Sequence, residues 1–254
     1  MNLADLLAKL SYGPLSELAM AGEGSGVVPA ASIPKLIIAI NDALVKLYTR
    51  FSLERKTLVL ETVDGIYAYR LTQEYAQTSS SNQPNKYIKD SVVYPFTGDV
   101  LQVVGVMGNA AKLPTDPEYI TQPRLPVSDY IDLPLNDRND RLSWHTTAFD
   151  TLSMDYPKTG DRYFVLYRAK HAPIPLVPAN AAAVDIRLPD VLESALLAYV
   201  AYRIYGGMSM EMAVSKSRIH LQVYESECAE LENQNLFNQS EASTNMKPVL
   251  HGWR

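Results

Sequence analysis

The chain has 254 residues, of which 47% are hydrophobic, and a net charge of −5, so it can bury the core of one large domain or two small ones. It contains no run near the roughly 18 apolar residues of a membrane span, and its N-terminus lacks the basic start and long apolar core of a signal peptide. These two absences argue against membrane proteins and secreted proteins and favour a protein that stays where it is made. Lys and Arg form no dense cluster, which argues against a tight binder of nucleic acid.

The first third of the chain is predicted to be helical. Leu3–Leu10 forms a short helix, and an amphipathic helix begins at Ser32 with Pro34 in its first turn and ends near Phe51. The glycine-rich segment Gly22–Gly26 between them follows a helix, and it has neither the GxGxxG pattern nor a following Lys-Ser or Lys-Thr. It is therefore interpreted as a linker and not as a nucleotide-binding loop.

From Lys56 onward the hydrophobic pattern changes to a period of two, which is typical of strands. Thr57–Val63 and Ile66–Leu71 flank Asp64-Gly65, a pair of residues that favours a hairpin turn. Five prolines between 114 and 134 exclude a continuous helix there and would interrupt a central strand. Further strands are predicted at Ser91–Tyr94, Asp99–Met107, Leu142–Phe149 and Arg162–Lys170, with Asp185–Leu188 as a last strand or a lead-in to the helices that follow.

Two antiparallel helices are predicted between Leu188 and Leu231. Pro189 suits the first turn of the first helix, Gly206 or Gly207 would supply a left-handed stop, and Ser209 could cap the second helix. The second helix is predicted to have two faces. Its packed face carries Ala213, Ile219, His220, Val223, Tyr224 and Leu231, and its polar face carries Glu211, Lys216, Arg218, Glu225, Glu227 and Glu230.

Aromatic and basic residues are concentrated in this hairpin, where leucines would be usual. Two interpretations stay open: the tyrosines are amphipathic core residues whose hydroxyls reach the edge, or they form a subunit interface, where Tyr and Arg are enriched. The candidate interface residues are Tyr199, Tyr202, Arg203, Tyr205 and Tyr224.

The last residues, 233–254, are rich in polar residues but carry spaced apolar ones. Such a segment builds no core of its own, so it is either a frayed terminus or an arm that docks on a partner. Trp253 favours docking, because an exposed tryptophan requires a reason. The candidate docking residues are Leu236, Phe237, Met246, Val249, Leu250 and Trp253.

The search for chemistry gives no catalytic residue. The four histidines are scattered, Cys228 stands alone between acidic residues, and no HExxH or GxSxG motif is present. We therefore expect no metal and no cofactor. An enzyme whose active site is assembled from distant residues would leave no such motif, and this alternative stays open.

The order of the elements predicts an α+β fold. Helices 1–55 and a helical hairpin 188–232 would pack together as a bundle, a β-rich domain of sandwich or barrel type (56–187) would be inserted between them, and 233–254 would form an extended C-terminal docking arm.

Two segments carry a resemblance to a known family. The run from Pro189 to Tyr205, the short turn after it and the helix that ends at Leu231 resemble the C-terminal helices of phage head-to-tail adaptor proteins, including the tail tubular protein A type of short-tailed phages. The helix from Ser32 to Phe51, with the pattern Ile-Pro-x-Leu-Ile-x-x-Ile-Asn-x-Ala-Leu, is similar to the opening helix of these proteins. The β-rich middle has no such match.

The resemblance implies a structural virion protein of the tail or neck and not an enzyme. It implies a homo-oligomeric ring, commonly a dodecamer, that joins the portal protein to a tail nozzle or tubular protein and lines a conduit through which DNA passes during ejection without sequence-specific binding. The acidic balance suits such a conduit, because like charge lets DNA slide. Another phage tail role, as a nozzle or head-completion protein, is the alternative within the same class.

Overall fold

The computed structural model describes residues 1–234 except 82, 84, 109–130, 134, 138–142 and 156. The described chain combines helices with antiparallel sheets, so the predicted mixed α and β class is confirmed. It divides into two compact units: a helical unit made of Met1–Leu53 and the chain from His171 onward, and a β unit made of Glu54–Lys170.

Among its described residues, the helical unit contains four α-helices: α1 (Leu3–Tyr12), α2 (Ile33–Arg50), α4 (Glu193–Gly206) and α5 (Glu211–Asn233). Short 3-10 turns lie at Ala19–Ala21, Ala30–Ser32, Ala181–Ala183 and Asp190–Leu192. Asn2 caps α1, since its side-chain oxygen accepts the N–H of Asp5 at 2.8 Å.

Two of the predicted helix starts differ in detail from the structure. Ser32 stands at the start of α2, but its side chain makes no capping hydrogen bond. The expectation that Ser209 caps the second helix of the hairpin is wrong, because α5 begins at Glu211 after the extended Met210. Ser209 therefore lies one residue before the cap position.

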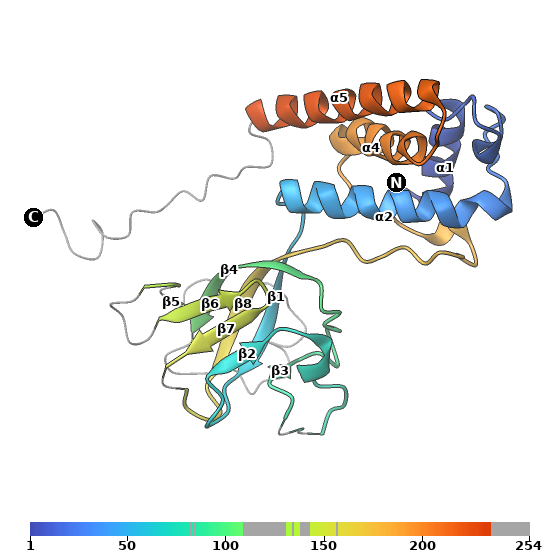
Figure 1. Ribbon diagram of the computed structural model, residues 1–254. Coiled ribbons are helices and arrows are strands. Elements are labelled where there is room, and N and C mark those ends of the chain that lie inside the picture. Colours follow the sequence, from blue (N-terminus) through green and yellow to red (C-terminus); the bar gives the residue numbers. More distant parts are fainter. Residues whose placement is uncertain are drawn as a thin grey trace, which may run out of the picture. The chain divides into compact units, whose positions relative to one another are not determined.

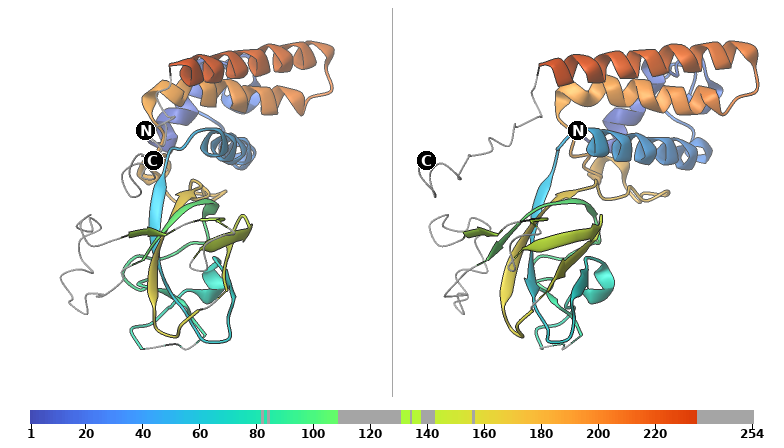
Figure 2. Two further views of the ribbon diagram at one scale, coloured as in Figure 1. Left: turned by 90° about the vertical axis from the view of Figure 1, so that its left-hand side faces the viewer. Right: turned by 60° about the vertical axis from the view of Figure 1, so that its left-hand side comes forward.

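The core of the helical unit forms around α4, which packs against both α2 and α5 and lies between them (Figures 1 and 2). Three alanines of α4 (Ala195, Ala198 and Ala201) are buried beside Leu196 and Ile204. Small side chains at three-residue steps allow neighbouring helices to approach closely. No helix among the described residues is long and apolar enough to cross a membrane.

The start of the chain is bonded to the segment that precedes α4. Leu3 donates its N–H to the carbonyl of Val184 at 3.0 Å, and Ile186 donates its N–H to the carbonyl of Met1 at 2.8 Å. Asp185 and Asn2 form a single antiparallel bridge, so the expected strand at Asp185–Leu188 is reduced to this one pair.

The described residues of the β unit form two antiparallel sheets. The first has the order β3-β1-β8-β4-β5 and the second has the order β2-β7-β6. The strands are β1 (Arg55–Glu61), β2 (Ala68–Arg70), β3 (Ile88–Lys89), β4 (Val100–Gly108), β5 (Ile131–Leu133), β6 (Trp144–Ala148), β7 (Thr151–Met154) and β8 (Arg162–Ala169), with a 3-10 turn at Gln73–Tyr75.

Two sequence predictions for this unit are wrong. Asp64-Gly65 forms a turn, with Gly65 at φ 77°, but the strands beside it are not a hairpin: β1 pairs with β3 and β8, whereas β2 pairs with β7 in the other sheet. Ser91–Tyr94 forms a turn and not a strand, because Asp90 adopts a left-handed φ of 59° and its carbonyl accepts the N–H of Tyr94 at 2.8 Å.

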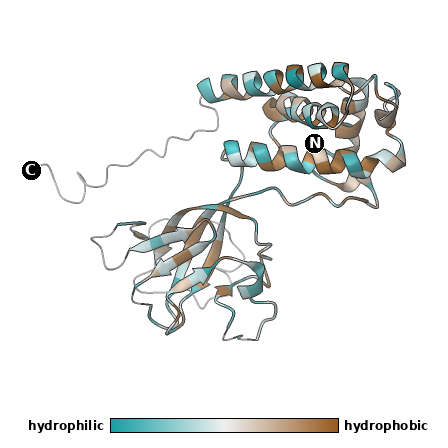
Figure 3. Ribbon diagram, viewed as in Figure 1, coloured by the Kyte–Doolittle hydropathy of each residue, from teal (hydrophilic) through white to brown (hydrophobic). Residues whose placement is uncertain are grey.

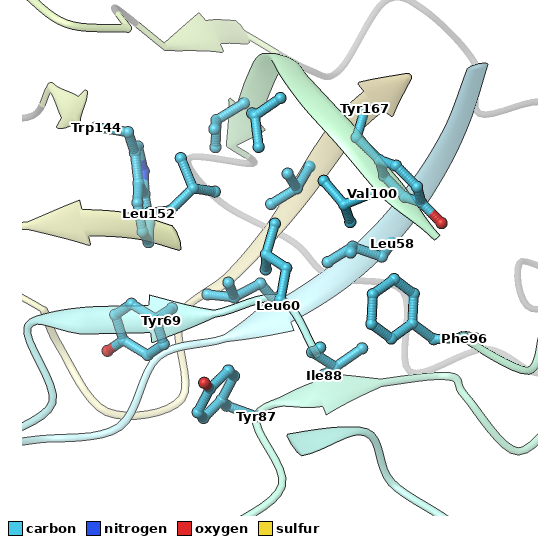
Figure 4. Packing of buried hydrophobic residues seen from close by; sticks show 14 of the residues in the cluster. Leu58, Leu60, Tyr69, Tyr87, Ile88, Phe96, Val100, Trp144, Leu152 and Tyr167 are labelled. Carbon is cyan, nitrogen blue, oxygen red and sulfur yellow. The ribbon is translucent and has the colours of Figure 1, made fainter. Parts of the chain in front are cut away.

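The core of the β unit joins the two sheets. Figure 4 shows side chains from both sheets in one cluster, among them Leu60 of β1 and Leu152 of β7. Trp144 is fully buried there, with its ring centre 5.8 Å from that of Tyr69 and 5.0 Å from that of Tyr163. Tilted and edge-to-face aromatic pairs of this kind add to the energy of burial.

Candidate functional site

The hairpin of α4 and α5 is held by aromatic contacts along its length. The ring centre of Tyr199 on α4 lies 4.9 Å from that of Tyr224 on α5 and 5.5 Å from that of Tyr202 on α4. Nearer the turn, Tyr205 stacks on His220 at 5.5 Å with an angle of 10° between the rings. Burial lowers the pKa of His220, so the neutral imidazole is favoured in this stack.

The double glycine ends α4 in an unexpected way. Gly207 has φ −84°, so the expected left-handed stop is wrong. Gly206 is the last residue of the helix, and a Cβ added to it would lie 3.1 Å from Oγ of Ser217 on α5. Ser217 also donates its hydroxyl to the carbonyl of Tyr202 at 3.1 Å. The glycine therefore permits the close approach of the two helices.

The five residues predicted to form a subunit interface occupy different environments. Tyr199, Tyr205 and Tyr224 are buried inside the helical unit, and the hydroxyl of Tyr205 donates to the carbonyl of Pro14 at 3.1 Å. Tyr202 is half-buried and Arg203 is exposed. The three buried rings support the packing of the chain itself, and the part of this set that a partner could touch is Tyr202 and Arg203.

Arg50 at the end of α2 is a central residue that the sequence interpretation missed. Its Nε and Nη2 donate to the two carboxylate oxygens of Glu232 at 2.7 and 3.1 Å, and its Nη1 donates to Glu225 at 2.6 Å. The guanidinium also lies 5.9 Å from the ring centre of Tyr224. These contacts tie the end of α2 to the second half of α5. The hydrogen bond from Arg50 lowers the pKa of Glu232.

The family of the chain follows from a comparison with known sequences. Residues 1–249 match the SU10 adaptor proteins, a family of structural adaptor proteins of bacteriophages. The chain belongs to the SU10 adaptor protein family. No curated protein sequence matches it.

Membership of the SU10 adaptor family sets the class of function. The protein is a structural component of a phage virion, and it interacts with other proteins of the head or tail. The match covers nearly all of the chain and therefore both units. Proteins of this family are generally not enzymes. The more specific likeness to tail tubular protein A stays a prediction.

The described part of this SU10 adaptor offers no grouping of side chains that resembles a metal centre: no three His, Cys, Asp or Glu residues converge within it. Cys228 is buried, and burial raises the pKa of its thiol, which disfavours the reactive thiolate. His145 lies in β6, where its carbonyl accepts the hydroxyl of Ser153 across the pair of strands. The six residues predicted to dock the C-terminal arm lie outside the described residues.

The orientation of α5 differs from the sequence prediction. Ile219 and Val223 were expected to share the packed face with Tyr224, but both are exposed. The buried face consists instead of Ala213, Ser217, Tyr224, Cys228 and Leu231. Figure 3 shows bands of hydrophobic and hydrophilic residues along α5, and a helix that carries apolar residues on two faces does not reveal from its sequence which face the chain will cover.

Proposed function

We propose that this SU10 adaptor joins the portal to the tail as a closed ring of identical subunits, commonly twelve, through which DNA passes. The observation that carries the proposal is the family match over residues 1–249, which covers the helical unit and the β unit together. In a ring, each subunit contacts its two neighbours through two different faces. The rotation between neighbouring subunits sets the number of subunits at which the ring closes.

In this proposal the N- and C-terminal helices form one bundle with the β domain inserted between them. The close packing of α4 between α2 and α5 and the bonds from Met1 and Leu3 to Val184 and Ile186 support such a bundle. We assign subunit contacts to the helical unit, because its helices are braced by ion pairs between distant segments. These pairs are Lys9 with Glu193 at 2.6 Å, Asp42 with Arg203 at 2.7 Å, and Glu17 with Lys216.

The β unit is assigned to the tail partner, a nozzle or tubular protein. Its turn after Asp90 exposes three consecutive apolar side chains, Val92, Val93 and Tyr94, each with 46% to 53% of its surface accessible. Exposed apolar groups that follow one another on a turn are typical of a contact with another protein. A β surface that differs among related adaptors would fit tails that differ.

The C-terminal segment 233–254 is assigned to the portal. It begins where α5 ends at Asn233, and its spaced apolar residues could be buried one by one on neighbouring portal subunits. DNA is not gripped in this proposal, because the net charge of −5 repels its phosphates.

The test is the mass of the purified chain by light scattering, alone and with the portal protein of the same phage. We expect a large defined complex with the portal. A matched variant that lacks Leu236–Arg254 should keep the circular dichroism and melting temperature of the full chain but should not attach to the portal. If the full chain forms no complex with the portal, the proposed function is wrong. If the truncated chain still binds the portal, the C-terminal arm is not the docking segment.

A further inference from the structure

Two stripes of apolar side chains lie on the surface of the helical unit. The α5 stripe consists of Met212, Ile219 and Val223, of which 70%, 57% and 39% of the surface is accessible. The α2 stripe consists of Ile38 and Val45, which are 51% and 45% accessible. In both helices the first two members are seven residues apart, and residues at this spacing lie on one face two turns apart.

The face that bears the α5 stripe carries one cation, Lys216, which lies four residues after Met212 and three before Ile219 and is ion-paired with Glu17. The other residues of this face between positions 212 and 226 are uncharged: Met212, Ser215, Ile219, Gln222, Val223 and Ser226. A solvent-facing helix surface normally carries several charged residues, and a depletion of charged residues in an exposed patch is the compositional mark of a protein interface. The α5 stripe therefore has the character of a contact surface that this chain leaves uncovered.

The α2 stripe lies on the same surface as Arg203, the exposed member of the predicted interface residues. Ile38 and Val45 flank Asp42, which lies four residues after the first and three before the second and therefore on the same face. Asp42 is ion-paired at 2.7 Å with Arg203 of α4. The predicted interface residue Arg203 and the α2 stripe thus lie on one surface, which is opposite to the buried face of α2 with Leu36, Ile40, Ala43 and Leu47.

The two stripes are not able to cover each other within one chain. Each lies outside the buried face of its own helix, and α4 lies between the two helices (Figures 1 and 2). A second copy of the chain can bring them together, with the α5 stripe of one subunit on the α2 stripe of the next. Such a contact is heterologous and leaves one stripe free at each end, so it continues until a ring closes.

The charges beside the two stripes are complementary. Lys35 and Lys46 are exposed at one edge of the α2 stripe, and Asp42 is already neutralised by Arg203. At the α5 stripe, the acidic residues are Glu211, Glu227 and Glu230, with Arg218 as the cation on the outer edge, whereas Lys216 is paired with Glu17. The α2 side is thus net basic and the α5 side is net acidic, which orients one helix on the other and disfavours pairing of like with like.

We propose that the α5 stripe of one subunit packs on the α2 stripe of its neighbour and that this contact closes the adaptor ring. The inference rests on the proposed function for the ring itself and adds the two surfaces that form it. We assign a second copy of the chain as the partner of each stripe, because the apolar residues of the two stripes have the same spacing and the charges beside them are opposite. Pairing of a stripe with itself, or occupation by a helix of the portal, are the outcomes that would overturn the proposal.

The first test uses two variants that each block one stripe. Ile38→Asp with Val45→Asp blocks the α2 stripe, and Ile219→Asp with Val223→Asp blocks the α5 stripe. The matched control places the same two aspartates at Val27 and Val191, which are exposed but belong to neither stripe. Because every changed side chain is exposed, we expect all three variants to retain the melting temperature and circular dichroism of the wild type, and we expect only the control to assemble with the portal into the wild-type complex.

A mixture of the two blocked variants separates the proposed contact from pairing of like with like. Each variant alone should have the mass of a monomer, and an equal mixture should give a dimer and nothing larger, because only one α5 stripe and one α2 stripe remain able to meet. A dimer of either variant alone would overturn the proposal.

Cross-linking tests the contact even where the free protein associates weakly. Val45→Cys in one chain and Ile219→Cys in another, with tags of different mass, are treated with a short bismaleimide at high concentration and again with the portal. We expect the mixed product to exceed both self-products, and the double variant to give a ladder of multiples that ends at the ring number. The wild type is the control, because Cys228 is buried.

The two proposals fail in distinguishable ways. A chain that attaches to the portal without a 45-to-219 product would overturn the inference and leave the adaptor function standing. If the mixed cross-linked product forms but the chain does not bind the portal, the subunit contact stands and the proposed attachment to the portal is wrong. If neither product nor attachment is found, both are wrong.

Discussion

The helical unit and the β unit are assembled from the chain in different ways. The helical unit is assembled from the two ends of the chain, and ion pairs such as Arg50 with Glu232 and Asp42 with Arg203 join these ends. The β unit is continuous in sequence and is held by an apolar core in which aromatic rings from both sheets meet. Both units bury apolar side chains and contain ion pairs between distant residues, such as Glu61 with Arg162 in the β unit. The difference is that the contacts of the helical unit join two separate segments of the chain, whereas those of the β unit stay within one segment.

The largest effect is expected in the β unit. Trp144→Ala removes a fully buried indole that packs on Tyr69 and Tyr163, which should lower the free energy of unfolding by about 3–5 kcal/mol. Two-step thermal unfolding followed by circular dichroism would show an early β transition and an unchanged helical one. Phe149→Ala, at a position that is 68% exposed, is the control. A single transition shifted as a whole would mean that the two units unfold together.

A smaller effect is expected at Arg50 in the helical unit. Arg50→Ala leaves Glu225 and Glu232 without their shared cation and removes the guanidinium from the ring of Tyr224. The guanidinium is three-quarters buried and makes three charge-assisted hydrogen bonds, so the loss should be about 1–3 kcal/mol, measured by urea unfolding. Lys46→Ala on the same helix has an exposed cation and should change the stability far less. If Arg50→Ala and Lys46→Ala lower the free energy of unfolding equally, the contacts of Arg50 with Glu225 and Glu232 do not stabilise the helical unit.

The same ion pair predicts how stability depends on pH. The bond from Arg50 lowers the pKa of Glu232 below its ordinary value of 4.5, so the pair stabilises the folded state above that value. This contribution is lost as the pH falls through the lower folded pKa. Urea midpoints of the helical unit should therefore fall as the pH drops below the ordinary glutamate pKa of 4.5, and the fall attributable to Glu232 should be absent in Arg50→Gln. An identical pH profile in the variant would contradict the assignment.

The smallest effect on stability is expected at the exposed part of the hairpin. Replacing Tyr202 and Arg203 by alanine breaks the surface ion pair with Asp42, in which both side chains are nearly half exposed, and such pairs contribute about 0–1 kcal/mol. The same change should weaken the association of subunits, because Arg203 lies on the surface of the α2 stripe. The mass of the assembled complex measures this. A variant that assembles with wild-type affinity would show that these residues are not in an interface.

The helices and long strands could be predicted because their periodicity is local. The apolar steps of α2 and α4 and the alternation in β4 and β8 each occur within one short segment, so the elements were found to within a few residues. Pairing is not local. Asp64-Gly65 predicts a turn, but whether β1 pairs with β2 or with β8 depends on residues a hundred positions away.

The candidate site shows the same division. The concentration of tyrosines in the hairpin was visible in the sequence, and burial in the core was one of its two interpretations. The sequence alone could not choose between them, because Tyr199 and Tyr224 face each other from different helices. The partners of Arg50 could not be found, since Glu232 lies far along the chain and no spacing rule connects them. Ile219 and Val223 were assigned to the buried face of α5, but they are exposed and Tyr224 is buried. The helix carries apolar residues on two faces, and its sequence does not show which of them the chain covers.

The backbone bonds that join Met1 and Leu3 to Ile186 and Val184 impose an order on biosynthesis. When α1 and α2 leave the ribosome, the segment that completes their unit has not been translated, and the whole β unit must follow first. Contacts of such long sequence separation form late, so the nascent helices remain amphipathic and uncovered while the β unit is already able to fold. Each new chain therefore becomes competent for assembly only when its second half has been made, which delays association with neighbours until translation is nearly finished.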